Sequence, residues 1–111
     1  GTLVVHKYPD IGQELPKAIE VCLKLQEQHK LILLTMRDGK ELEEAVNWCK
    51  EIGLEFWAVN DNPTQAEWTQ SRKVYANIYI DDAAFGCPLV EIEGARHAVN
   101  WNEVERLLLV D

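Results

Sequence analysis

The segment from residue 71 to residue 82 has the sequence SRKVYANIYIDD, and it decides the predicted fold. A polar, basic stretch leads into the apolar run Ile78–Ile80, which ends in two adjacent carboxylates, Asp81 and Asp82. Because β-branched and aromatic side chains suit a pleated surface, we expect residues 77–80 to form a buried strand. In open α/β sheets, ligands bind where the carboxyl ends of the strands meet. The pattern therefore predicts that both aspartates lie at such an edge.

Two neighbouring carboxylates repel each other unless a cation or a proton lies between them. A hard divalent cation such as Mg²⁺ prefers oxygen ligands and usually takes one or two carboxylates. Asp81 and Asp82 are therefore candidate metal ligands. The alternative interpretation is a solvated Asp-Asp turn that follows a strand.

The rest of the chain alternates between helical and strand patterns. Apolar residues at helical spacing predict helices over about 14–27, from Asp38 to near Gly53, and after the expected N-cap Asn100. Asp38 and Glu41 have the spacing of a capping box. Further strands are expected at 31–34, 54–59 and 89–93, with a short helix or irregular segment at 65–72. This order predicts one domain over residues 1–111, with a three-layer Rossmann-like α/β fold and a mostly parallel sheet flanked by helices.

Composition restricts the classes of function. The formal charge of −8 argues against nucleic-acid binding, which depends on basic side chains that neutralise phosphates. No apolar run approaches the roughly 20 residues that cross a bilayer, so no membrane partner is expected. Cys22 and Cys49 fall on apolar helical faces, and the three cysteines form no CxxC pattern. Reduced core cysteines of this kind are typical of a cytoplasmic protein.

Three further polar residues flank the expected strands. Thr35 follows the run at 31–34 and precedes a helix, where a hydroxyl and free backbone N–H groups suit an oxyanion or a phosphate. Lys73 precedes the strand at 77–80, and Arg37 lies near the helix start, where it is a candidate substrate contact. Each has a simpler interpretation: Thr35 ends a strand and bonds its own backbone, and the two cations are ordinary exposed residues.

Taken together, these motifs resemble those of the haloacid dehalogenase-like (HAD-like) hydrolases, in particular small members without a large cap domain. The run at 31–34 followed by Thr35 is similar to the motif that contacts the phosphoryl group. Lys73 is similar to the family lysine, and Ile78–Ile80 with Asp81 and Asp82 is similar to the acidic metal motif. Residues 1–4 are similar to the tail of the first motif, Asp-x-Asp-Gly-Thr, whose two aspartates are absent from this sequence.

The resemblance implies a Mg²⁺-dependent phosphatase that forms an aspartyl-phosphate. Thr35 and Lys73 would be catalytic, Thr35 and Arg37 would bind the substrate, and Asp81 with Asp82 would hold Mg²⁺. The nucleophilic aspartate and a central strand would precede Gly1, so the domain is expected to be incomplete at its N-terminus. The expected partner is a small phosphorylated substrate, and a homodimer is compatible with the small flap at 6–12.

Two other functions stay open at this stage. The first is a catalytically inactive binding or regulatory domain that lacks the first motif. The second is a receiver-like module, which the late position of Asp81 and Asp82 disfavours, because a receiver carries its acidic pair on the first strand. The identity of the substrate is not encoded in so short a flap.

Overall fold

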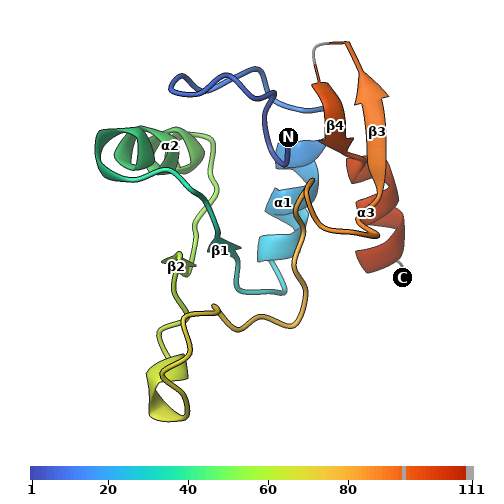
Figure 1. The fold of residues 1–111 in the computed structure, drawn as a ribbon. Helices are drawn as coiled ribbons and strands as arrows, with labels where there is room; N and C mark the ends of the chain where they lie inside the picture. The colour runs from blue at the N-terminus through green and yellow to red at the C-terminus, as the bar shows by residue number, and fades with distance from the viewer. Residues whose placement is uncertain (94, 110–111) are drawn as a thin grey trace.

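The structure is a computed structural model that describes residues 1–93 and 95–109 (Figure 1). Its regular elements lie in this order along the chain: α1 (Ala18–Gln26), β1 (Ile32–Leu33), α2 (Gly39–Glu51), β2 (Ala58–Val59), the 3₁₀ helix η1 (Gln65–Glu67), β3 (Leu89–Ile92), β4 (Ala95–Val99) and α3 (Trp101–Leu108). In Figure 1, α1 lies between the β1–β2 pair and α3. The segment from η1 to β3 is a long connection without regular structure.

The strands form two separate two-stranded sheets. β1 pairs with β2 in parallel, with Ile32 opposite Ala58 and Leu33 opposite Val59. β3 and β4 form an antiparallel hairpin with an irregularity between Val90 and Ile92. A hairpin needs only a short turn, whereas the parallel pair needs the crossover that α2 supplies between its strands.

The predicted three-layer Rossmann-like fold with a mostly parallel sheet is wrong. The parallel pairing extends over two residues in each strand, and the other sheet is antiparallel. The expected strand at 77–80 is not formed: within the described residues its backbone makes no hydrogen bond to a neighbouring strand. Apolar side chains favour a strand, but a ladder also needs a partner backbone at hydrogen-bonding distance. The short strands predicted near 31–34, 54–59 and 89–93 are present in part.

The core lies where α1 packs against α3 and the hairpin. Its fully buried side chains include Leu15, Val21, Leu54 and Val99. The prediction that Cys22 and Cys49 are reduced core residues is confirmed as to burial: their relative exposures are 7% and 3%, and both are free thiols. Burial, with Cys49 nearby, raises the pKa of Cys22 to about 12, and burial raises the pKa of Cys49 to about 11.

The helix ends agree in part with the sequence patterns. The predicted N-cap of α3 is confirmed, because the Asn100 side chain accepts a hydrogen bond from the Glu103 backbone N–H at 3.2 Å. Gly53 follows α2 with a φ of +94°, a left-handed conformation that glycine adopts without strain. The capping box predicted at α2 is wrong, since Asp38 makes no side-chain cap hydrogen bond.

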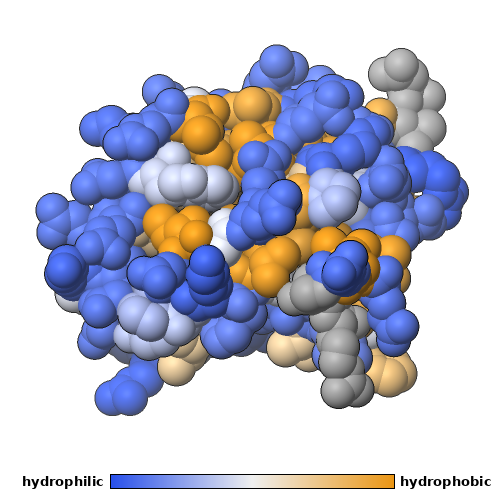
Figure 2. Space-filling model, turned by 90° about the horizontal axis from the view of Figure 1, so that it is seen from above, coloured by the Kyte–Doolittle hydropathy of each residue, from blue (hydrophilic) through white to orange (hydrophobic). Residues whose placement is uncertain are grey.

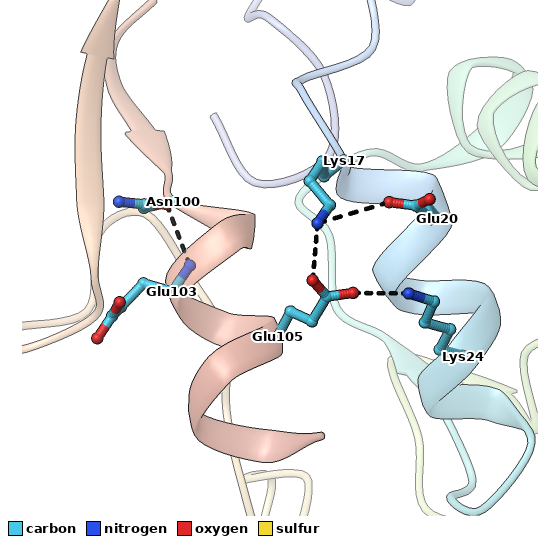
Figure 3. A network of polar contacts seen from close by, with 6 residues as sticks. All are labelled: Lys17, Glu20, Lys24, Asn100, Glu103 and Glu105. Carbon is cyan, nitrogen blue, oxygen red and sulfur yellow. Dashed lines mark hydrogen bonds and ion pairs between the residues drawn. The ribbon is translucent and has the colours of Figure 1, made fainter. Parts of the chain in front are cut away.

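A charged network joins α1 to α3 (Figure 3). The Glu105 carboxylate accepts hydrogen bonds from Lys17 Nζ and Lys24 Nζ, each at 2.7 Å. These two hydrogen bonds lower the pKa of Glu105 to about 2. The contacts join residues more than 80 positions apart and link the two helices at the surface.

Apolar side chains remain uncovered on part of the surface. On the face that Figure 2 shows, apolar patches lie between hydrophilic side chains. The exposed large apolar residues include Met36, Ile78, Tyr79 and Phe85. Among the described residues, no helix is long and apolar enough to cross a membrane.

Candidate functional site

Thr35 stands between the end of β1 and the beginning of α2, as its sequence position implied. Its hydroxyl oxygen accepts a hydrogen bond from the Arg37 backbone N–H at 3.1 Å. The hydroxyl proton has no acceptor among the described residues, so it is available for a ligand oxygen. The first N–H groups of an α-helix have no intrahelical partner, and Asp38 does not cap them with its side chain. Thr35 and the first N–H groups of α2 are here called the Thr35 corner. This corner offers several donors to an anion.

Asn60, which the sequence patterns did not single out, holds the backbone of Thr35 in place. Asn60 Oδ1 accepts from the Thr35 N–H at 2.8 Å, and Asn60 Nδ2 donates to the Thr35 carbonyl at 3.1 Å. Asn60 follows β2 and has a φ of +52°, a left-handed conformation that asparagine tolerates better than most residues. The sequence feature that could have indicated this role is an asparagine directly after the neighbouring strand, β2.

Asp82 lies beside the first residues of the chain. Its Oδ1 accepts a hydrogen bond from Thr2 Oγ1 at 2.9 Å. Gly1 is so close that a β-carbon at that position would clash with Asp82 Oδ2. Trp101 Nε1 in turn donates to the Thr2 carbonyl at 2.7 Å, which connects Thr2 to α3. The half-buried Asp82 carboxylate is thus held by contacts that bridge the two ends of the chain.

Asp81 is exposed and closes its own turn, since its Oδ1 accepts from the Ala83 backbone N–H at 2.8 Å. In each of Asp81 and Asp82, Oδ2 has no hydrogen-bond donor among the described residues. Carboxylate oxygens without donors are ligands of the kind that Mg²⁺ prefers, beside water and phosphate oxygens. Among the described residues, no group of three or more His, Cys, Asp or Glu side chains is placed to hold a metal.

Lys73 is not connected to the other candidate residues. Its Nζ lies 5.5 Å from the centre of the Tyr79 ring, and its carbonyl accepts from Gln65 Nε2 at 2.7 Å. Within residues 1–93 and 95–109, no hydrogen bond or ion pair joins Lys73 to Thr35, Asp81 or Asp82. The structure therefore places Lys73 on an exposed segment that the buried side chain of Gln65 organises.

Arg37 contacts the loop at residues 6–12. Its guanidinium donates to the Pro9 carbonyl at 3.0 Å and to the Asp10 carbonyl at 2.8 Å. It also lies 5.4 Å from the centre of the Tyr8 ring. Arg37 and Thr35 therefore share one turn of the backbone, while the Arg37 side chain reaches back to the beginning of the chain.

A groove of about 470 Å³ separates β1 from residues 75–80. Leu31, Ile32 and Trp57 line it from the β1–β2 pair, and Ile78 and Ile80 line it from the unpaired segment. The lining is mainly apolar. The groove therefore exposes to solvent the segment that the sequence predicted to be a buried strand.

The fold is that of a small protein with helices, a short parallel strand pair and an antiparallel hairpin. Its candidate site residues are Thr35 at a helix start and the acidic pair Asp81 and Asp82. No protein-family model matches the chain, and no curated protein matches it. Among solved structures, the chain is similar to a conserved protein from Bacteroides thetaiotaomicron, with a TM-score of 0.78 and 39% sequence identity. The match covers 98% of this chain and 83% of that one. The chain belongs to the same family as that conserved protein.

Proposed function

We propose that this chain carries the phosphate-binding and magnesium-binding part of a phosphohydrolase of the HAD-like type. The observation that carries the proposal is the Thr35 corner: a hydroxyl with a free proton, held by Asn60 next to the uncapped start of α2. Oriented hydroxyl and N–H donors at a helix start stabilise anions such as phosphate. The motif resemblance supports the same chemistry, although the fold it implied is wrong.

In this proposal each residue has a separate task. The Thr35 hydroxyl donates to a phosphoryl oxygen, and the nearby N–H groups of α2 hold a second oxygen. Asp81 and Asp82 would bind Mg²⁺, which neutralises charge on the phosphate when it is bound. The Thr2 hydroxyl orients the Asp82 carboxylate. The attacking carboxylate that the resemblance implies is not in this sequence; in the proposal it would form an aspartyl-phosphate.

The substrate class in this proposal is a small phosphate ester. The formal charge of −8 disfavours a polynucleotide, because the protein surface would repel its phosphates. The reduced, buried Cys22 and Cys49 fit a cytoplasmic location. A homodimer fits the apolar side chains that are left exposed, among them Phe85.

The alternative is a binding domain without catalysis. The lack of a three-residue metal group among the described residues favours it. The groove of about 470 Å³ also favours it, since an apolar groove next to an unpaired segment suits an extended peptide. In a binding domain, Asp81→Asn should leave the function unchanged or raise stability, because it removes repulsion between two carboxylates.

Hydrolysis of p-nitrophenyl phosphate by the full-length protein, with Mg²⁺ present, tests the proposal. Thr35→Val should reduce kcat strongly and Thr35→Ser should restore most of it, because serine keeps the hydroxyl. Thr69→Val is the matched control, since the one hydrogen bond of the Thr69 hydroxyl among the described residues is accepted from the Ser71 backbone N–H. Equal activity of Thr35→Val and wild type would refute the role of the corner.

A further inference from the structure

Residues 6–12 form a loop, here called the strap, that leaves the body of the protein and returns to it. Backbone hydrogen bonds close its base: the Val5 N–H donates to the Gln13 carbonyl at 2.8 Å, and the Leu15 N–H donates to the Leu3 carbonyl at 2.9 Å. Val4 and Glu14 form an antiparallel bridge beside them. Residues 6–10 beyond this base are exposed.

Arg37 makes the contacts that hold the tip of the strap. It donates to the carbonyls of Pro9 and Asp10, and its guanidinium lies over the Tyr8 ring. Within the described part of the chain, no other hydrogen bond or ion pair joins residues 6–12 to the rest of the protein. The position of the tip therefore depends on one side chain.

We infer that Arg37 is a latch: it holds the strap in the absence of ligand, and an anion bound at the Thr35 corner competes for its guanidinium and releases the strap. The competition rests on the proposed function, whereas the latch itself rests on the contacts alone. The device couples the occupancy of the corner to the position of an exposed loop.

The chemistry of the acceptors favours such an exchange. The strap offers the guanidinium two neutral carbonyl oxygens. Guanidinium binds phosphate through two parallel hydrogen bonds, and the opposite charges of the two groups add an attraction that neutral carbonyls lack. The Arg37 N–H already donates to Thr35 Oγ1, so the side chain starts from the same turn as the anion-binding hydroxyl. A phosphate at Thr35 is thus the stronger of two competing partners.

Hydrogen exchange of the full-length protein, followed by mass spectrometry, tests the latch. Exchange in the strap is measured at the two hydrogen-bonded amides that close its base, those of Val5 and Leu15. Arg37→Met should raise this exchange about tenfold, the effect of losing roughly one net charged hydrogen bond. Exchange in α1 and α3 should stay unchanged and thereby show that the fold is intact. Arg72→Met is the matched control, because Arg72 is exposed and lies far along the chain from the strap. Unchanged exchange in the strap of Arg37→Met would overturn the latch.

A second variant keeps the test valid if Arg37→Met fails to fold. Tyr8→Leu removes the ring that lies beside the guanidinium and keeps both carbonyl acceptors. It should raise exchange in the strap by a smaller factor than Arg37→Met. If Arg37→Met does not fold and Tyr8→Leu does, unchanged amide exchange in the strap of Tyr8→Leu would also overturn the latch.

Inorganic phosphate tests the competition. Saturating phosphate with Mg²⁺ should raise exchange in the wild-type strap toward the level of Arg37→Met, and should leave that variant unaffected. Phosphate that binds, as seen by calorimetry, without a change in the strap would overturn the competition and leave the proposed function standing. An absence of phosphate binding would overturn both the competition and the proposed function.

Discussion

Thr2 Oγ1 donates a hydrogen bond to Asp82 Oδ1 at 2.9 Å, although the two residues are 80 positions apart. The contact fixes one of the two candidate metal ligands against the start of the chain. The Trp101 indole, which donates to the Thr2 carbonyl, anchors the same residue to α3. Asp82 is therefore held by tertiary contacts, whereas Asp81 is exposed and closes its own turn.

Replacement of the Thr2 hydroxyl should remove its hydrogen bond to Asp82 and lower the stability of the protein. Thr2→Val keeps the shape of the side chain and removes the donor, so the free energy of unfolding should fall by about 1 kcal/mol. Chemical denaturation measures the change. Thr2→Ser keeps a hydroxyl and is the control, and equal stability of the valine variant and wild type would show that the bond contributes nothing.

Loss of the N-cap of α3 should also destabilise the protein. Asn100→Ala removes the acceptor for the Glu103 N–H, and caps of this kind contribute about 1 kcal/mol. Asn102→Ala is the matched control, because Asn102 is exposed within the same helix. In thermal denaturation, the Tm of Asn100→Ala should fall more than that of Asn102→Ala. An equal change in Tm for both variants would contradict the role of Asn100 as the cap.

The Glu105 network should make stability depend on pH in the acid range. The pKa of Glu105 is lowered from the ordinary value of 4.5 to about 2 by its hydrogen bonds to Lys17 and Lys24. The contribution of Glu105 to the free energy of unfolding is therefore complete above about pH 4.5 and is lost as the pH falls toward 2. Glu105→Gln should flatten the fall in the free energy of unfolding over this window, and the exposed Glu67→Gln should not. Parallel curves for Glu105→Gln and wild type would contradict the network.

The cysteines should differ in reactivity. A thiolate is the reactive form, and the pKa values of about 12 for Cys22 and about 11 for Cys49 keep both protonated at neutral pH. Both are also buried, whereas Cys87 is half-buried. Iodoacetamide should therefore modify Cys87 alone in the native protein and all three in denaturant, as mass spectrometry would show. Rapid native modification of Cys22 would contradict the packing.

Local sequence patterns predicted the features that depend on neighbouring residues. The Asn100 cap and the glycine after α2 are set within one helical turn, and both were found. The burial of Cys22 followed from helical spacing in the same way. These features need no information about the rest of the chain.

Features that depend on distant partners were not predicted. The run Ile78–Ile80 has strand-forming residues, but a strand is a property of two paired backbones, and its partner is absent among the described residues. The β4 strand was missed because the residues after 93 lack the alternating apolar pattern. Asn60 was missed because its role lies in the backbone of Thr35, 25 positions earlier.

The most direct test of the phosphohydrolase proposal is the Mg²⁺ dependence of p-nitrophenyl phosphate hydrolysis by the full-length protein and its aspartate variants. Hydrolysis should require Mg²⁺, and Asp81→Asn and Asp82→Asn should abolish it while the fold is kept. Asp61→Asn, at an exposed position between β2 and η1, should retain the activity. Hydrolysis that is absent from the wild type, or that survives both substitutions, would contradict the proposal.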